Sequence, residues 1–197
     1  MANIIKLTAS DGSTVEFYDE IKAQGGVKDV YFSTDKTYVV AFYRNPTNAN
    51  DKARLENIVG VYREKIFVQN SDGDYWNDIF AWPTKMVEWK GLTGIVIPFY
   101  NKKFFFTGID AQWPFIKNGQ EKNGKWFSSA KLINKFVPAD QKGTFLSRLH
   151  MCLKIARGIR RIHAAGLAHS DLSYNNVLVD PLSGSACIID DDGLVVP

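Results

Sequence analysis

The chain has 197 residues, of which 45% are hydrophobic and 23% are charged. This composition is that of an ordinary globular protein, and it excludes collagen-like, coiled-coil and intrinsically disordered chains. The net charge of +3 is too small to indicate nucleic-acid binding by itself, and no hydrophobic stretch has the length of a membrane span or a signal peptide. With only two cysteines, Cys152 and Cys187, the sequence predicts neither a disulfide framework nor a zinc site. We therefore expect a cytoplasmic protein with no nucleic-acid and no membrane partner.

Residues 1–100 have the pattern of an antiparallel, β-rich domain with one helix. Short runs of β-branched and aromatic residues alternate with turn residues such as Asp11-Gly12, which is typical of a tight hairpin. Apolar residues then recur at helical spacing between positions 50 and 67. The expected strands are 4–7, 14–18, 30–32, 38–43, 86–89 and 94–97.

Residues 101–197 have a different pattern. Positions 107–142 show little periodicity and are expected to form a loop or insertion. A long helix is predicted from about residue 143 to its C-cap at Gly166, and two short strands are predicted at 177–179 and 186–189. One face of this helix is apolar and contains Leu146, Leu149, Leu153, Ala156, Ile159 and Ile162.

Carboxylate and carboxamide side chains are concentrated after this helix. A loop presents Asp171 and Asn176, and the strand pair returns to the acidic turn 190–193. One carboxylate can accept the proton of a hydroxyl, and the others are hard oxygen ligands of the kind that Mg²⁺ prefers. Asp and Asn are also common in solvated turns, so each residue alone indicates little. The ordered set favours phosphoryl transfer.

In this order the segment resembles the protein kinase-like superfamily. His169-Ser-Asp171 matches the catalytic-loop motif, Asn176 follows at the required spacing, and Asp191-Asp192-Gly193 matches the Asp-Phe-Gly motif. The resemblance implies an α+β protein kinase-like fold, with 1–100 as the N-lobe and 101–197 as the hinge, insertion, catalytic helix and start of the C-lobe. It also implies ATP and Mg²⁺ as cofactors, Asp171 as the catalytic base, and Asn176 and Asp191 as metal ligands. Asp190 is the other candidate for the ligand, but the position of the glycine favours Asp191.

The same resemblance assigns a nucleotide site to the first domain. Gly25 and Gly26 lie in an incomplete glycine-rich loop, and Val30 aligns with the valine that follows this loop in kinases. Ala41 is on the next strand, and the hinge that would contact adenine spans Ile97–Tyr100, with Ile97 and Phe99 as the candidate contacts.

The strand lysine of kinases is missing, because its position falls on Ala41 or Tyr43. Arg44 lies on the opposite face by strand alternation, so it is a poor replacement. Lys28 in the glycine loop could contact the phosphates instead, as in kinases that supply this lysine from the neighbouring strand, or it could be a solvated charge. Glu56 is the first candidate for the acidic helix partner, and Glu64 is the second.

Other departures bear on regulation. Ser170 replaces the motif arginine that in kinases binds an activation-loop phosphate, so we expect no such switch here. Asp192 replaces the packing phenylalanine, and Ser173 replaces a lysine of the Ser/Thr kinases.

A closer resemblance comes from Phe80-Ala-Trp-Pro-Thr84, together with the segments 87–91 and 94–98. These segments look like those of the bacterial, tellurite-resistance-associated group of kinases. The resemblance implies phosphatase and von Willebrand-type partner proteins. A simple structural role is also open, in which Trp82 is an aromatic anchor in the core.

Three functions compete. The first is an ATP- and Mg-dependent, Ser/Thr-type protein kinase that transfers the γ-phosphate to the hydroxyl of a protein substrate. The second is a pseudokinase, which the missing strand lysine favours. The third is a small-molecule kinase of the aminoglycoside type, which the small Ser170 and Ser173 fit. Kinases cover the apolar face of the catalytic helix with further helices, so we expect the chain to be a fragment truncated after the Asp-Phe-Gly-like motif.

Overall fold

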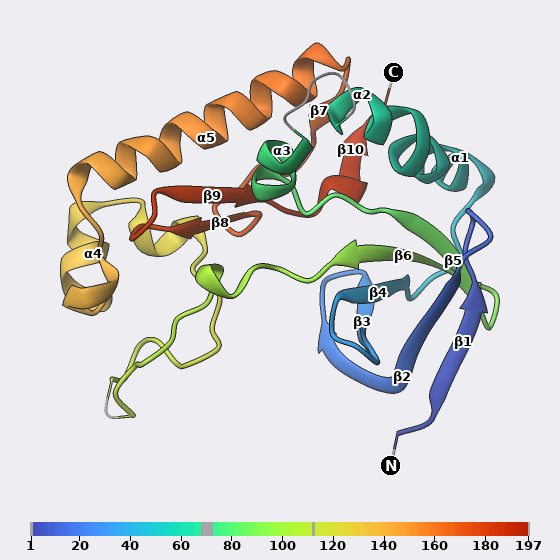
Figure 1. Cartoon of the computed structure of the whole chain (residues 1–197), viewed down its shortest axis with the longest axis horizontal. Coiled ribbons are helices and arrows are strands. Elements are labelled where there is room, and N and C mark those ends of the chain that lie inside the picture. The colour runs from blue at the N-terminus through green and yellow to red at the C-terminus, as the bar shows by residue number, and fades with distance from the viewer. Residues whose placement is uncertain (1, 68–72, 112, 197) are drawn as a thin grey trace. The chain divides into compact units, whose positions relative to one another are not determined.

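The computed structural model describes residues 2–67, 73–111 and 113–196. The chain divides into two compact units, one with residues 1–69 and 82–99 and the other with residues 70–81 and 100–197 (Figure 1). Besides residues 100–197, the second unit includes the segment 70–81.

The first unit contains a six-stranded antiparallel sheet with all six predicted strands. The strand order is β1-β2-β3-β4-β6-β5, so each strand pairs with its neighbour in sequence except where β6 lies between β4 and β5. The strands are β1 (Ile4–Thr8), β2 (Thr14–Gln24), β3 (Lys28–Ser33), β4 (Tyr38–Tyr43), β5 (Lys85–Trp89) and β6 (Leu92–Pro98).

One face of this sheet carries the core of the first unit. Phe17, Tyr31, Phe42 and Trp89 pack ring against ring, with centroid distances of 5.3–5.7 Å. Buried Val15, Val40, Val87 and Val96 complete the cluster. Side chains alternate across a strand, so the residues between these positions point to the other face.

The predicted helix at 50–67 is present but irregular. It begins as α1 (Ala49–Asn57), continues as a π-helix (Ile58–Tyr62) and ends as α2 (Arg63–Phe67). Trp82 is only 1% exposed, and its indole Nε1 donates to the Ile58 carbonyl at 2.9 Å, where the π-helix begins. Trp82 is therefore an anchor in the core of this unit.

The second unit is built on the long helix α5 (Phe145–Ala164) and the hairpin of β8 (Val177–Asp180) and β9 (Ser185–Ile188). Thr144 and Ser147 form a capping box at the start of α5, and Gly166 adopts φ +85° just after its end, as predicted. At Gly158 a Cβ atom would lie 2.7 Å from Ile188 Cδ1 and 2.9 Å from Ile79 Cγ2. The missing side chain lets helix and hairpin approach closely.

The residues of α5 that are buried are, with one exception, not those of the predicted apolar face. Met151, Gly158 and Ile162 are buried, whereas Leu146, Leu149 and Leu153 are 61%, 48% and 55% exposed. Only Ile162 belongs to both sets. Most of the apolar stripe therefore remains uncovered within this chain.

Two short helices were not predicted. α3 (Gly73–Ile79) belongs to the second unit, and α4 (Ala130–Phe136) lies within the segment expected to be loop or insertion. Ile109, Ile116 and Val137 of that segment form a buried core together with Phe106, the residue just before it. It is therefore a packed part of the unit despite its weak periodicity.

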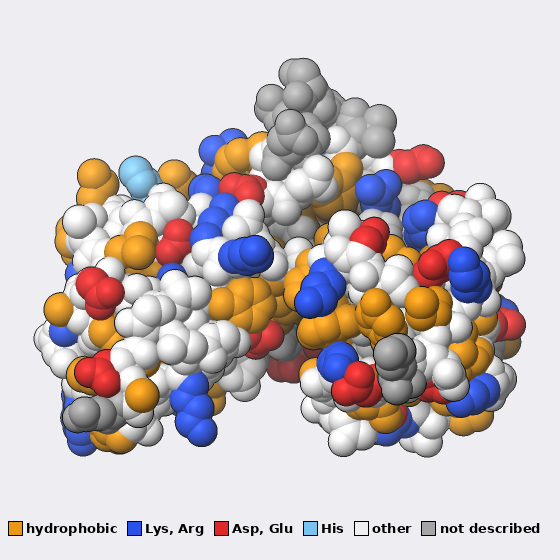
Figure 2. Space-filling model, turned by 60° about the horizontal axis from the view of Figure 1, so that its bottom comes forward, with side chains coloured by type: hydrophobic (Ala, Val, Ile, Leu, Met, Phe, Trp, Pro, Cys, Tyr) orange, Lys and Arg blue, Asp and Glu red, His pale blue; other side chains and the backbone are white. Residues whose placement is uncertain are grey.

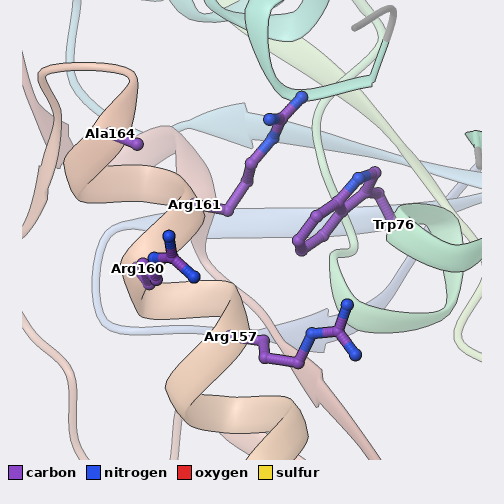
Figure 3. Close-up of a pocket in the computed structure, with 5 residues that line it drawn as sticks. All are labelled: Trp76, Arg157, Arg160, Arg161 and Ala164. Atoms are coloured by element: carbon purple, nitrogen blue, oxygen red, sulfur yellow. The ribbon is translucent and has the colours of Figure 1, made fainter. Parts of the chain in front are cut away.

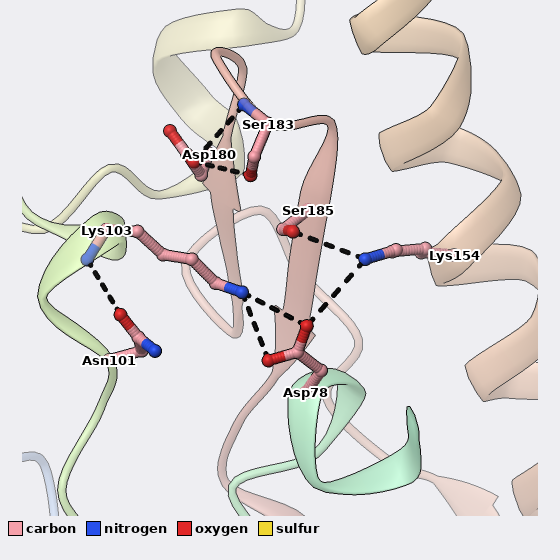
Figure 4. Close-up of polar contacts among 7 residues, drawn as sticks. All are labelled: Asp78, Asn101, Lys103, Lys154, Asp180, Ser183 and Ser185. Carbon is pink, nitrogen blue, oxygen red and sulfur yellow. Dashed lines mark hydrogen bonds and ion pairs between the residues drawn. The ribbon is translucent and has the colours of Figure 1, made fainter. Parts of the chain in front are cut away.

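A polar network joins α3, α5, β9 and the segment around Asn101 (Figure 4). Lys103 Nζ lies 3.1 Å from both carboxylate oxygens of Asp78, and Lys154 Nζ lies 4.0 Å from Asp78 and 3.2 Å from Ser185 Oγ. Lys103 and Lys154 thus both contact the Asp78 carboxylate, which links α3 to α5 and to the segment around Asn101.

Charged side chains of both signs are interspersed on the face in Figure 2. Within the described residues, no helix has the length and apolarity needed to cross a membrane.

Candidate functional site

The segment with the catalytic-loop motif is bonded to the segment with the Asp-Phe-Gly-like motif. Two short strands, β7 (Ala168–His169) and β10 (Leu194–Val195), pair antiparallel. His169 Nε2 lies 3.2 Å from the Ile189 carbonyl, and Ser170 Oγ donates to the Gly193 carbonyl at 2.9 Å. The two motifs therefore form one bonded structure within the second unit.

Asn176 is placed against the candidate base. Its Nδ2 donates to Asp171 Oδ2 at 3.1 Å and to the Asp171 carbonyl at 2.8 Å, which fixes the direction of the amide. Its own backbone carbonyl accepts a hydrogen bond from Ile189 N at 3.0 Å, just before the acidic turn. The Asn176 side chain thus bonds to the candidate base, and its backbone bonds to the strand end that precedes the acidic turn.

The three consecutive aspartates have different environments. Asp190 is exposed and adopts a left-handed backbone with φ +66°, which Asp tolerates better than most residues. This turn leads into a 3₁₀ turn in which Asp191 is 1% and Asp192 is 2% exposed. The carboxylates of Asp190 and Asp191 therefore face different surroundings, although they are adjacent in sequence.

The negative charge of this acidic turn contributes to raised pKa values of two neighbouring groups, Tyr100 and Cys187. Burial, followed by the negative charges of the carboxylates of Glu121, Asp190 and Asp191, raises the pKa of the Tyr100 phenol. Burial, together with the charge of Asp191, also raises the pKa of the Cys187 thiol. Both groups are therefore neutral near pH 7, and Cys187 is not a reactive thiolate. The pKa of Glu121 is raised because the carboxyl is desolvated.

A magnesium ion fits the donor atoms of this region. Asn176 uses its amide nitrogen for Asp171, and no described residue donates a hydrogen bond to its Oδ1, the atom that binds metals. No group of three or more His, Cys, Asp or Glu in the described parts of the chain could hold a metal ion. Mg²⁺ commonly needs only one or two protein ligands beside phosphate oxygens, so Asn176 and Asp191 would suffice.

Candidate nucleotide-binding residues of the first unit share one face of its sheet. Val30 pairs with Ala41, and Ala41 pairs with Ile95, two positions before Ile97. Strand alternation then puts Val30, Ala41 and Ile97 on the face opposite the aromatic core. Lys28 has the same parity as Val30 and pairs with Tyr43, and its Nζ lies 5.6 Å from the Tyr43 ring centroid. Lys28 is thus next to Tyr43, one of the two positions expected for the strand lysine.

The glycine pair forms the tip of the β2–β3 hairpin. Gly25 N donates to the Lys28 carbonyl at 2.9 Å. The guanidinium of Arg44 donates to the Gly25 carbonyl at 2.9 Å and also to the Gly26 carbonyl, and it lies 3.4 Å from Asp29 Oδ1. Arg44 was not predicted to have this role. Only the three-dimensional pairing of β3 with β4 brings its side chain to the tip.

The remaining two candidates lie elsewhere in the first unit. Glu56 is exposed and lines a pocket with Lys52, Glu88 and residues of β1 and β5. A different pocket contains Tyr43 with Asp51, Arg54 and Leu55 of α1. Phe99 packs edge-to-face on Phe32 with centroids 4.8 Å apart, and its N–H donates to the Thr37 carbonyl at 3.0 Å. Of the hinge candidates, Phe99 is therefore positioned by both packing and a backbone bond.

Comparisons with known proteins identify the fold. No protein-family model and no curated protein matches the chain. Among solved structures, a Toxoplasma gondii specific rhoptry antigen kinase domain superposes with a TM-score of 0.58 and 13% identity, covering 98% of this chain and 54% of that one. The ROP18 kinase domain in complex with AMP-PNP and sucrose superposes with a TM-score of 0.55 and 16% identity, covering 98% of this chain and 56% of that one. ROP2 from Toxoplasma gondii, a virulence factor with a protein-kinase fold and no enzymatic activity, superposes with a TM-score of 0.54 and 13% identity. The match covers 98% of this chain and 55% of that one.

The chain thus spans about half the length of these kinase structures. At such low identity the matches establish the fold and leave the activity open, since one neighbour has none. The six-stranded sheet with its helix, the long α5 and the bonded loop–turn pair agree with this comparison. The chain therefore has an α+β, protein kinase-like fold.

Proposed function

We propose that the chain is the nucleotide-binding and catalytic part of an ATP- and Mg-dependent protein kinase. Asp171 is the base, Asn176 and Asp191 hold Mg²⁺, and Lys28 binds the nucleotide phosphates. Gly25, Gly26, Val30, Ala41, Ile97 and Phe99 form the remainder of the nucleotide site, and Glu56 is a candidate partner for a phosphate-binding lysine.

The reaction would transfer one phosphoryl group to a hydroxyl. The hydroxyl oxygen of the protein substrate forms a bond to the γ-phosphorus, and the bond from that phosphorus to the bridging oxygen of ADP breaks. The hydroxyl proton passes to the Asp171 carboxylate. Bound Mg²⁺ would neutralise charge on the phosphate oxygens. Asn176 orients Asp171 through its two hydrogen bonds, so base and metal ligand are held in register.

The bonding of Asn176 to Asp171 is the observation that carries this proposal. An ordinary solvated turn has no need for a carboxamide that bonds both the carboxylate and the backbone carbonyl of the residue five positions earlier. Here Asn176 contacts Asp171 with its side chain and Ile189 with its backbone. The same pair lies at the catalytic-loop spacing of the kinase motif.

The adjacent aspartates provide a sharp test of the metal assignment. Mg·ATP is titrated calorimetrically into the wild-type protein, Asp191→Asn and Asp190→Asn. We expect Asp191→Asn to weaken Mg-dependent binding at least tenfold, and Asp190→Asn, an equal change of charge one residue away, to weaken it less than threefold. Equal effects of the two variants, or no Mg-dependent binding to the wild type, would contradict the proposal.

A pseudokinase is the second candidate, and a specific observation favours it. Tyr43 stands near the place of the strand lysine, and Lys28 packs over its ring. The similar ROP2 has a protein-kinase fold and no enzymatic activity. Mg-dependent binding of ATP without transfer of phosphate to a protein would support this reading. Transfer to a small hydroxyl compound instead would support the aminoglycoside-type alternative.

The closer assignment to the tellurite-resistance-associated group, with its phosphatase and von Willebrand-type partners, remains part of this proposal, as does a cytoplasmic location. We also propose that the functional protein contains more chain than these residues. The exposed Leu146, Leu149 and Leu153 on α5 support it, because additional helices would cover them. A longer natural form in which these leucines stay accessible to solvent would contradict it.

A further inference from the structure

A basic pocket in the second unit has no role in the proposed chemistry. It lies between α3 and α5, has a volume of about 230 Å³ and is lined by Trp76, Arg157, Arg160, Arg161 and Ala164 (Figure 3). Arg157 lies one turn before Arg160 and Arg161 on α5, at the i,i+3 and i,i+4 spacings that make helical side chains neighbours. In Figure 3 the side chains of Arg157 and Arg161 extend from α5 toward the side that carries Trp76.

The helix that carries the three arginines contains no acidic residue. No Asp or Glu occurs between Asp140 and Asp171, a stretch that includes the whole of α5. Within the described part of the second unit, Lys103, Lys122 and Lys154 form ion pairs, and no ion pair includes Arg157 or Arg160. Guanidinium groups that share a pocket repel one another, so an anion that enters it gains a favourable interaction with each.

Aromatic residues hold two of the guanidinium groups in place. Arg157 Cζ lies 4.7 Å from the Tyr75 ring centroid, and Arg161 Cζ lies 5.1 Å from that of Trp76. Trp76 itself stacks on Phe80 with centroids 6.0 Å apart. Stacking restricts the side chains and lowers the entropy lost when they bind. A guanidinium presents paired N–H donors that match two oxygens of a phosphate.

We propose that this pocket binds a phosphate monoester, supplied by a phosphorylated side chain of a protein segment. The volume is below the range of about 300–1,000 Å³ for sites that take small molecules, so a phosphate on a side chain fits better than a whole nucleotide. The ring of Trp76 already contacts Phe80 and Arg161, so it offers little open surface for a nucleobase. The site is separate from Asp171 and does not depend on the proposed catalysis.

Fluorescence anisotropy tests this site with a labelled, glycine-rich peptide that carries one phosphoserine. The same peptide with unmodified serine is the ligand control. We expect the phosphopeptide to bind the wild-type protein and Arg157→Gln/Arg160→Gln to weaken that binding at least about tenfold. The matched control Lys131→Gln/Lys135→Gln removes two exposed charges from α4 of the same unit, and we expect less than a twofold change.

Each remaining outcome decides the proposal. Equal binding of the two peptides, or equal losses in the arginine and lysine variants, would indicate only a general charge effect and overturn it. Tighter binding of phenyl phosphate or ribose 5-phosphate than of the phosphopeptide would assign the pocket to small phosphate esters and overturn the protein source. Unchanged phosphopeptide binding in Asp191→Asn would support a site distinct from the nucleotide site, and a parallel loss would overturn it. Thermal melts confirm that every variant is folded.

Discussion

The loop–turn pair of the second unit and the glycine hairpin of the first unit differ in how closely they keep the kinase pattern. In the second unit, Asp171 and Asn176 occupy their motif positions and bond directly to each other. In the first unit, the strand lysine is absent, Lys28 lies over Tyr43, and Arg44 binds the tip of the hairpin. The difference teaches that the loop–turn segment can keep the kinase motif spacing while the glycine hairpin and the neighbouring strand depart from the kinase pattern.

The largest effect is expected at the candidate base. Asp171→Asn keeps the shape of the side chain but removes its ability to accept a proton, so phosphate transfer by the protein should fall about 10²–10⁴-fold. Affinity for Mg·ATP should change little, and calorimetry checks this separately from a transfer assay. The control Ser173→Ala changes a neighbouring loop residue outside the assigned set. Unaltered phosphate transfer by Asp171→Asn would show that Asp171 is not the base, and the proposed contrast between the two regions would then fail.

The second effect concerns the rearranged phosphate binding. Lys28→Met removes a charged hydrogen bond of about 1.5–3 kcal/mol, so the Kd for Mg·ATP should rise roughly 10–100-fold. Lys22→Met is the matched control, because Lys22 is an exposed lysine on β2 of the same hairpin. Equal affinities of the two variants would make Lys28 a solvated charge and leave the first unit without a replacement lysine.

The third effect tests the packing that supports the loop–turn pair. A Cβ at position 158 would meet Ile188 and Ile79 at less than 3 Å, so Gly158→Ala should lower the free energy of unfolding by about 1–3 kcal/mol. Gly60→Ala, in the π-helix of the first unit, meets nothing within 4 Å and should be neutral or slightly stabilising. Chemical denaturation measures both. An unchanged free energy of unfolding in Gly158→Ala would show that α5 and β9 have room to separate.

The smallest effect is a pH dependence of stability at Glu121. Burial raises the pKa of this carboxyl in the folded chain, so the folded state binds its proton more tightly than the unfolded state does. Its contribution is therefore most favourable at low pH and is lost as the pH rises from the ordinary carboxyl value through the raised one. Glu121→Gln should melt higher than wild type near pH 7, with a difference that shrinks toward pH 4. A difference that is constant with pH would contradict this.

Much of the architecture could be predicted locally. The six strands and α5 have strong periodicity and clear turn or cap residues, and they occur where expected. α3 and α4 were missed because each has only seven residues, too few for a pattern to emerge. Motif spacing predicted Asp171 and Asn176 together because they are close in sequence. No such signal could link Arg44 to the glycine tip or Trp76 to three arginines about eighty positions later.

The sequence by itself determined the order of the six strands and the long helix and the ordered set of chemical groups, since both depend on patterns among near neighbours along the chain. The tertiary structure decided which face of α5 is buried, that Trp82 anchors the π-helix, and that an arginine pocket forms against α3. Those features depend on contacts between distant segments. Whether a leucine or a glycine lies inside is set by what packs against it, and an amphipathic pattern alone does not specify that partner.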